Sequence, residues 1–305
     1  MLRWMDASGY INLQLSTIYY TTIMNSFKIK LAIFLLIGSL GISLAQKTTR
    51  LVILHTNDTH SQVEPTDKST LKTSDMGGYA RRMGLIAKIR KEEKNVLLLD
   101  AGDFSQGTPY FNFYNGRVEI NALNRMRYDA VTLGNHEFDN GMDTLATILR
   151  LAKFPIVSSN YSTENSALTG LTQPYITLRR FGLKIGILAL NVEPKGLIIE
   201  KNYDKLGYSD PLEKAKEISE KLKKQEKCDV VICLSHLGAD TTKLEINDFR
   251  IARSTQYIDV IIGGHSHSMI TDTKVTNAAG KPVIVAQMGK SGLYLGKIEL
   301  ELTRK

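Results

Sequence analysis

The stretch VTLGNHEFDNG, residues 131–141, decides how this sequence is interpreted. An apolar run ends at Gly134, and four polar residues then follow almost at once: Asn135, His136, Glu137 and Asp139. Asn, Asp and Gly all suit turns, so a simple turn before a helix is one interpretation. The other is a catalytic or metal-binding rim, because ligands gather at strand ends in open α/β sheets. The rest of the chain must separate these two interpretations.

Short apolar runs alternate with helical patterns on both sides of this stretch. We expect strands at 50–58, 95–103, 128–135, 154–160, 228–236, 257–267, 281–289 and 293–304, and a hairpin at 175–191 that turns at Phe181-Gly182. We expect helices at 77–94, 117–127, 141–153, 209–227 and 244–255. Continuous apolar strands that alternate with helices indicate buried sheets covered by helices. The pattern therefore predicts one α/β domain with mixed sheets.

The first 45 residues are expected to lie outside this domain. Two lysines precede an apolar stretch, 31–44, which is shorter than the ~20 residues of a membrane-spanning helix. This pattern is typical of a secretory signal peptide, with a start at Met24 and cleavage after Ala45. We expect an exported protein, periplasmic or secreted, with a catalytic domain at 46–305 and no membrane anchor after cleavage.

Net charge narrows the class of expected substrate, and cysteine spacing decides whether a disulfide can form. Removal of residues 1–45 takes away three cations and one anion, which lowers the net charge from +8 to +6. A mildly basic chain favours a small anionic substrate, but no basic block indicates a nucleic-acid polymer. Cys228 and Cys233 lie too far apart along an expected strand to pair with each other, so we expect two buried free thiols.

Polar side chains follow the expected strands in a regular way. Five of the six histidines, and also Asp58, Asp103 and Asn135, fall where an expected strand gives way to a loop. In extended chain, residues two apart point to one side, which would pair Asp58 with His60 and His265 with His267. His55 lies inside the first strand and is expected to be a packed or supporting residue. Seven candidate ligands result: Asp58, His60, Asp103, Asn135, His236, His265 and His267.

Seven ligands are too many for one tetrahedral zinc ion. They suit two metal ions about 3.5–4 Å apart if one carboxylate bridges them. The mixed nitrogen and oxygen ligands favour Zn, Mn, Fe, Co or Ni over Ca or Mg. Two divalent ions, two carboxylates and a bridging hydroxide leave a net charge of about +1, which suits a phosphate ester. Such a hydroxide is the expected nucleophile, because the metals lower the pKa of bound water to about 7.

Five motifs, each at the end of an expected strand, carry a family resemblance. They are NDTH (57–60), GDFSQGT (102–108), GNHEFD (134–139), SHLG (235–238) and GGHSH (263–267). Together they resemble the calcineurin-like metallophosphoesterase superfamily over about 51–302, and the first three resemble its 5′-nucleotidase branch. The resemblance implies a four-layer α/β/β/α sandwich of two mixed β-sheets flanked by helices. It assigns one metal to Asp58, His60, Asp103 and His267, and the other to Asp103, Asn135, His236 and His265.

The same resemblance implies roles for the opening stretch. His136 would stabilise the transition state or protonate the leaving oxygen, and Asp139 would orient it. Gly134 is expected to let the backbone turn beneath these residues. Glu137 is expected to be a cap or a surface residue.

The expected activity is hydrolysis of phosphate monoesters, 5′-nucleotidase-like, on nucleotides or other small phosphoesters. A 2′,3′-cyclic-nucleotide phosphodiesterase or a UDP-sugar hydrolase stays open, because these enzymes share the metal motifs. A non-catalytic exported metal-binding protein is the third interpretation, and the His136–Asp139 pair argues against it.

The resemblance also implies a second, C-terminal domain that stacks the base in 5′-nucleotidases. This sequence ends at Lys305, where we expect the catalytic domain to end, so one hypothesis is that a separate protein supplies that domain. The aromatic run at 108–116 would then either fill a gap under the rim or form an apolar binding patch, through Tyr110, Phe111, Phe113 and Tyr114.

Overall fold

The computed structural model describes residues 48–68, 72–240 and 246–303. The expected signal peptide therefore lies outside the described residues. Apart from Thr48 and Thr303 at the ends of two strands, the elements described below belong to the compact unit Thr49–Leu302. No helix in the described ranges is long and apolar enough to cross a membrane.

The first sheet has five strands in the order β13-β1-β2-β3-β4. Their bounds are β1 Thr48–Thr56, β2 Val96–Asp100, β3 Ala130–Thr132, β4 Ile156–Val157 and β13 Gly296–Thr303. The pairs β1–β2, β2–β3 and β3–β4 are all parallel, so their carboxyl ends meet at one edge of the sheet. This edge is where three of the predicted motifs begin.

The second sheet has six strands in the order β11-β12-β10-β9-β7-β6. Their bounds are β6 Tyr175–Arg180, β7 Leu183–Asn191, β9 Val230–His236, β10 Val260–Gly263, β11 Met269–Thr276 and β12 Pro282–Met288. The four inner strands are parallel, and β6 and β11 pair antiparallel at the two edges. The sheet is thus mixed, as predicted, and the predicted hairpin turns at Phe181 and Gly182, which both have positive φ.

Side-chain alternation in the strands produces four layers. In β1, Leu51 and Ile53 join an apolar cluster with Ile185 and Ile232 of the second sheet, so this cluster fills the space between the sheets. The alternate residues of β1, such as Val52, join a cluster with the helices α2 Tyr79–Glu92, α4 Arg117–Met126 and α5 Met142–Leu149.

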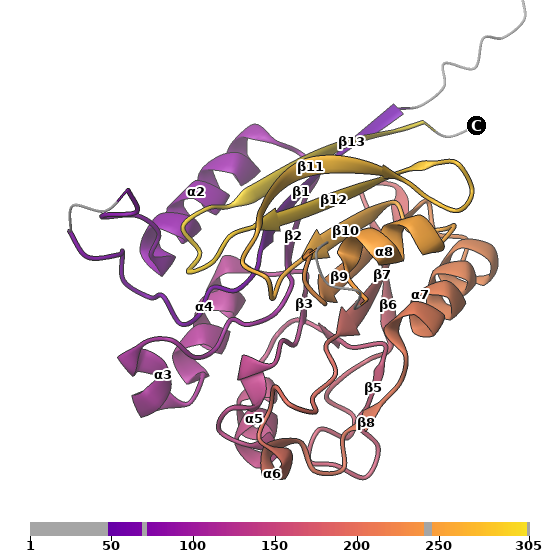
Figure 1. The fold of residues 1–305 in the computed structure, drawn as a ribbon. Helices are drawn as coiled ribbons and strands as arrows, with labels where there is room; N and C mark the ends of the chain where they lie inside the picture. The colour runs from indigo at the N-terminus through magenta and orange to yellow at the C-terminus, as the bar shows by residue number, and fades with distance from the viewer. Residues whose placement is uncertain (1–47, 69–71, 241–245, 304–305) are drawn as a thin grey trace, which may run out of the picture. The chain divides into compact units, whose positions relative to one another are not determined.

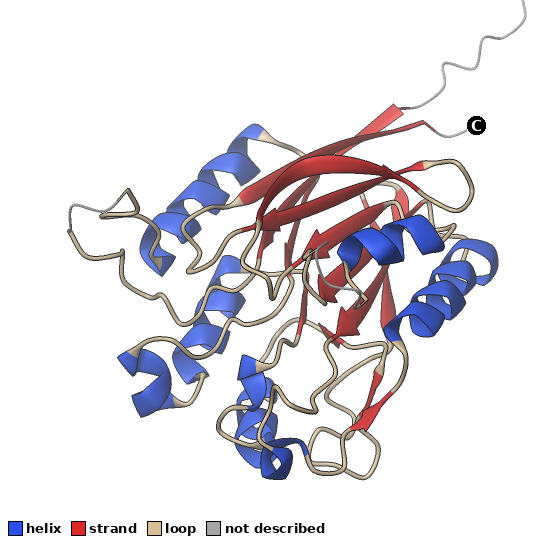
Figure 2. Cartoon of the chain, viewed as in Figure 1, coloured by secondary structure: helices blue, strands red, loops and turns tan. Residues whose placement is uncertain are grey.

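The second sheet is covered in the same way by α7 Pro211–Glu220 and α8 Asp248–Ser254. Figure 1 shows α2 and α4 along one side of the sheets and α7 and α8 along the other, and Figure 2 shows the same arrangement by element type. The expected α/β/β/α sandwich is confirmed.

Asn191 connects the two sheets with hydrogen bonds near the carboxyl edge. It lies at the end of β7 and is fully buried. Its amide donates to the carbonyl of Leu133 over 2.5 Å and to Thr132 Oγ1 over 3.1 Å, both beside β3 of the first sheet. Ser158 Oγ donates to its side-chain oxygen over 2.6 Å. This buried polar contact fixes the two sheets against each other beneath the site.

Several elements differ from the expectation. The strand expected at 95–103 ends at Asp100, because Gly102 and Asp103 turn with positive φ. The helix expected at 209–227 is α-helical only to Glu220 and continues as a π-helical turn, η2 Lys221–Gln225. Elements that were not expected are α3 Pro109–Tyr114, α6 Glu200–Tyr203, β5 Tyr161–Ser162, β8 Gly207–Tyr208 and β11. Cys228 and Cys233 are buried free thiols, as predicted.

Candidate active site

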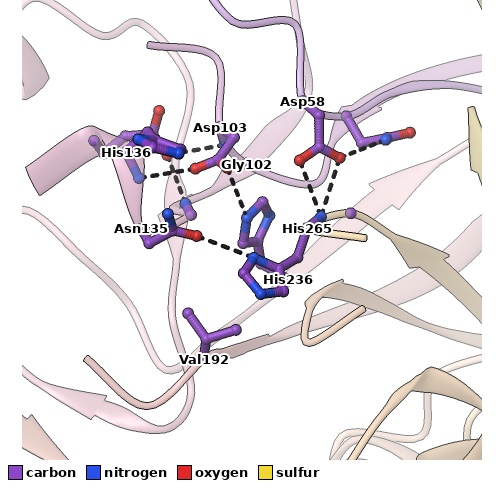
Figure 3. Close-up of polar contacts among 12 residues, drawn as sticks. Asp58, Gly102, Asp103, Asn135, His136, Val192, His236 and His265 are labelled. Atoms are coloured by element: carbon purple, nitrogen blue, oxygen red, sulfur yellow. Dashed lines mark hydrogen bonds and ion pairs between the residues drawn. The ribbon is translucent and has the colours of Figure 1, made fainter. Parts of the chain in front are cut away.

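The predicted ligands converge at the carboxyl edge of both sheets. Among the residues that the structure describes, two groups could each hold a metal ion: Asp58, His60 and His267, and Asp103, His236 and His265. Within each group the potential ligand atoms lie within 4.8 Å of one another. Figure 3 shows Asp103, Asn135, His236 and His265 pointing toward a common region from separate segments.

The first group lies at the mouth of the site. The Nε2 atoms of His60 and His267 are 3.0 Å apart, and His267 Nε2 is 3.4 Å from Asp58 Oδ1. The Asp58 carboxylate is fixed by the side-chain amide of Asn57 over 2.6 Å and by the backbone N–H of His265 over 3.0 Å. Burial lowers the pKa of His60, so its imidazole is neutral and offers a lone pair. This group can accept a cation.

In the second group Asp103 and His236 are buried, and His265 is partly buried. His236 Nδ1 donates to the carbonyl of Ala101 over 2.7 Å, so Nε2 is the nitrogen that faces the site. That Nε2 atom lies 3.1 Å from Asp103 Oδ2; burial acts to lower the pKa of His236, but the Asp103 carboxylate raises it to about 10. Burial lowers the pKa of His265 to about 4, so the His265 imidazole is neutral. Its Nδ1 atom lies 3.1 Å from Asn135 Oδ1, which brings the predicted neutral ligand to this group.

Asp103 lies between the two groups. Its Oδ2 atom is 3.1 Å from His236 Nε2 and 4.0 Å from His60 Nε2. Burial acts to raise the pKa of Asp103, but the charge and hydrogen bond of His236 hold it well below its ordinary value. The carboxylate therefore stays ionised in a buried position, as a ligand shared by two cations would need to be.

The space around these atoms fits metal ions. A Cβ atom on Gly134 would lie 2.1 Å from Asp103 Oδ1 and 2.6 Å from His236 Nε2. Gly134 does not have a positive φ, so the expected role in turning the backbone was wrong. Glycine is needed here for space. His236 Nε2 and Asp103 Oδ2 lie 3.1 Å apart, and a divalent ion bound by both atoms would replace the proton between them.

The backbone beneath the ligands is left-handed. Five of the predicted ligands have positive φ, between 44° and 70°: Asp58, His60, Asp103, His265 and His267. The expectation of extended pairs was therefore wrong, although both members of each pair still reach the site. Such conformations cost of order 1–3 kcal/mol each and persist only where the surroundings impose them.

Neighbouring loops impose this conformation through backbone hydrogen bonds. Asp58 N–H donates to the carbonyl of Gly102 over 2.9 Å, and His60 N–H donates to that of Asp103 over 3.0 Å. The loop after β1 is thus held against the loop after β2. Because of the left-handed turns, the side chains of Asp58, His60 and Asp103 lie over the ends of the strands.

His136 and Asp139 form the predicted pair at the mouth of the site. His136 Nδ1 lies 2.8 Å from Asp139 Oδ2, and each side chain is 34% exposed. The hydrogen bond that His136 donates to the Asp139 carboxylate raises the pKa of His136, which favours the imidazolium. The centroids of the His136 and His60 rings are 5.4 Å apart, so His136 lies beside the first ligand group.

Comparison with known proteins agrees with this geometry. A family model described as calcineurin-like phosphoesterase matches residues 51–269. This chain belongs to the calcineurin-like phosphoesterase family.

Relatives lie in the 5′-nucleotidase branch. This chain is 34% identical to a snake venom 5′-nucleotidase of Naja atra, over 84% of its own length and 51% of that protein. It is 35% identical to a 5′-nucleotidase of Homo sapiens, over 84% of this chain and 47% of that protein. The structure of a 5′-nucleotidase precursor from Thermus thermophilus matches this chain with a TM-score of 0.73 and 34% identity. The match covers 83% of this chain and 51% of that chain. The chain spans about half the length of these relatives.

Glu137 of the phosphoesterase is not the cap or surface residue that was expected. It lies in the 3₁₀ turn η1 His136–Phe138 and is only 2% exposed. Its carboxylate accepts backbone N–H groups from Asp103, Ser105 and Gly134, over 2.9, 2.9 and 2.5 Å. Glu137 therefore ties the loop after β2 to the loop after β3. The adjacent Phe138, fully buried, was the available signal that this turn packs inward.

His55 is packed, as expected. It is 1% exposed, and neither ring nitrogen has a hydrogen-bond partner. Burial lowers its pKa to about 4, so it is a neutral imidazole in the core of the phosphoesterase. Its ring lies against Gly296, where a Cβ atom would come within 2.1 Å of Nε2.

The aromatic run at 108–116 divides between core and surface. Phe111 of α3 is 4% exposed and packs inward, whereas Phe113 is 78% and Tyr114 is 53% exposed. Tyr110 donates its hydroxyl hydrogen to Glu64 Oε1 over 2.9 Å. Only part of this run therefore fills space beneath the rim.

Proposed function

We propose that this chain is an exported dinuclear metallophosphoesterase that hydrolyses phosphate monoesters, with 5′-nucleotides as its substrate class. The observation that carries this proposal is the position of the His136–Asp139 pair beside two ligand groups that share Asp103. Metal storage would need the ligands alone. Hydrolysis also needs a proton donor at the mouth of the site.

We assign one ion to Asp58, His60, Asp103 and His267, and the other to Asp103, Asn135, His236 and His265. The ligand chemistry suits Zn, Mn, Fe, Co or Ni. Divalent ions bound there would supply Lewis acidity and lower the pKa of water. Asn135 is neutral, so the site would keep positive charge for a phosphate group.

The protein's own groups would bind the ester and move the proton. His136, as the imidazolium that Asp139 stabilises, would donate its Nε2 proton to the leaving oxygen. Asp139 would act through His136 by fixing the ring and the tautomer. Glu137 would hold Asp103 and Gly134 in place through their backbone N–H groups.

Residues 46–305 form the catalytic domain in this proposal, and residues 24–45 form a signal peptide that directs export. The pattern of the first 45 residues supports export, and so does the name of a relative, a snake venom 5′-nucleotidase. The names of the relatives likewise support nucleotides as substrates.

The test is turnover of four esters by the metal-reconstituted mature chain: AMP, UDP-glucose, 2′,3′-cyclic AMP and bis(p-nitrophenyl) phosphate. We expect AMP to be hydrolysed with the highest kcat/KM, giving adenosine and phosphate. A higher kcat/KM on the cyclic nucleotide or on UDP-glucose would replace the nucleotidase assignment with one of those activities. Tight metal binding without turnover of any ester would overturn it.

A further inference from the structure

A cavity of about 720 Å³ opens beside the second ligand group. His265 and Ser266 line one part of it, and the loop after β7, residues 192–197, lines another. Figure 3 shows Val192 close to His265. Pockets for small organic ligands typically measure about 300–1,000 Å³, so this cavity has room for a nucleoside.

Tyr208 of β8 offers an aromatic surface to this cavity. Its ring is backed by the buried Tyr161, with the ring centroids 6.3 Å apart, yet it remains 36% exposed. The Tyr161 hydroxyl donates to the carbonyl of Val192 over 2.5 Å, which connects this support to the loop that lines the cavity. Tyr208 is therefore a supported aromatic residue with exposed surface.

The loop after β7 presents an apolar side chain to the same cavity. Leu197 is 52% exposed, although the next residue, Ile198, is 6% exposed and packs into the core. The N–H groups of both residues donate to the carbonyl of Pro194, over 3.1 and 2.9 Å. The loop is thus an anchored turn, and its geometry directs Leu197 outward.

A carboxylate lies next to the aromatic surface. Glu193 is exposed and lines the cavity. Burial raises the pKa of Tyr208 to about 12, and the nearby charge of Glu193 adds to this shift. A carboxylate in such a position can accept hydrogen bonds from the hydroxyl groups of a ribose, as it does in dinucleotide-binding proteins.

We propose that this cavity binds the nucleoside part of the substrate within the catalytic domain itself. Tyr208 stacks the base, Leu197 contacts it, and Glu193 accepts hydrogen bonds from the sugar hydroxyls. His265 lines the cavity and belongs to the second ligand group, so a nucleoside bound here places its phosphate toward the ligands. This inference rests on the proposed nucleotidase function.

The experiment compares AMP with glycerol 3-phosphate, a monoester that has no base, in the wild type and in Tyr208→Ala and Leu197→Ser. Stacking of a base on an aromatic side chain contributes to binding affinity. We therefore expect KM for AMP to rise roughly 10-fold in Tyr208→Ala, where this stacking is lost. The kinetics of Tyr208→Ala and Leu197→Ser with glycerol 3-phosphate should match those of the wild type. The conservative variant Tyr208→Phe, which keeps the aromatic ring, should have the wild-type KM for AMP. Tyr257→Ala is the matched control, because Tyr257 precedes β10 at the opposite end of that strand from the ligands.

Binding of adenosine, followed by calorimetry on the mature chain, gives a second measurement that needs no turnover. We expect Tyr208→Ala and Leu197→Ser to weaken it, and Tyr257→Ala to leave it unchanged. If AMP is hydrolysed but neither variant changes KM for AMP or adenosine binding, the cavity proposal is overturned and the nucleotidase function stands. If the wild type hydrolyses neither ester, the proposed function fails, and adenosine binding alone decides whether the cavity binds nucleosides.

Discussion

The two ligand groups differ in their exposure to solvent. In the first group, the side chains of His60 and His267 are 11% and 36% exposed, whereas His236 of the second group is fully buried. The second group is also fixed from behind, by the Ala101 carbonyl on His236 and by Glu137 on the backbone of Asp103. The comparison teaches that the second ion position is fixed from behind by the core and opens at His265 toward the cavity, whereas the first position lies more exposed at the mouth of the site.

The largest effect should come from the residue that both groups share. Asp103→Asn removes the one carboxylate between them, so we expect turnover of AMP to be nearly abolished and the metal content to fall. Elemental analysis and steady-state kinetics measure these two quantities. Asp143→Asn, at an exposed carboxylate on α5, is the control. Two metal ions per chain together with normal turnover in Asp103→Asn would disprove the shared role.

A smaller loss is expected from the exposed side of the site. His136→Ala should lower kcat by roughly 10²–10⁴, as for the loss of a general acid, while both ions stay bound. The reason is that His136 lies beside the first group without belonging to it. The same kinetics and elemental analysis apply, and loss of one ion would make His136 a ligand instead.

Glu137→Gln tests the support of the buried group. A glutamine side chain cannot accept all three backbone N–H groups, and an unsatisfied buried donor costs about 1–3 kcal/mol. We expect metal affinity to fall by about 10–100-fold, as for other residues that hold ligands in place. Titration with Zn²⁺ or Mn²⁺ measures the affinity, and Glu92→Gln, on the exposed face of α2, is the control. An unchanged affinity would show that the buried group does not depend on this support.

The smallest effect concerns pH. Asp139 raises the pKa of His136, and the acid must be protonated to act, so the wild type keeps its activity to higher pH. Asp139→Asn should therefore move the alkaline limb of the kcat/KM profile to lower pH, with metal content unchanged. A profile that does not move would mean that Asp139 does not set the pKa of the proton donor.

The sequence was sufficient for the buried sheets covered by helices and for the convergence of the candidate ligands, because both depend on local pattern. The division into four layers came from the family resemblance. Each apolar run that stops at a polar residue marked a strand end, and the parallel pairing of β1, β2 and β3 brought three of these ends together. The same pattern correctly predicted where the hairpin β6–β7 begins and ends, at residues 175 and 191.

What could not be predicted depends on contacts between distant segments. The left-handed backbone at Asp58 and His60 follows from hydrogen bonds to the loop after β2, more than forty residues away along the chain. Glu137 is buried because three N–H groups from two loops surround it, and a glutamate alone gives no sign of this. The cavity beside His265 likewise depends on how the loop after β7 lies against Tyr208.

The connection between the sheets has a mechanical consequence. In each ligand group, aspartate from the first sheet faces histidine from the second, just as Asn191 of β7 reaches the end of β3. An ion bound by either group would thus cross-link the two sheets at their common edge. Because ligands that bind only the folded chain stabilise it by mass action, metal ions should raise the melting temperature of the whole sandwich, in proportion to the logarithm of their concentration. Metal supply would then set the lifetime of the folded protein as well as its rate of catalysis.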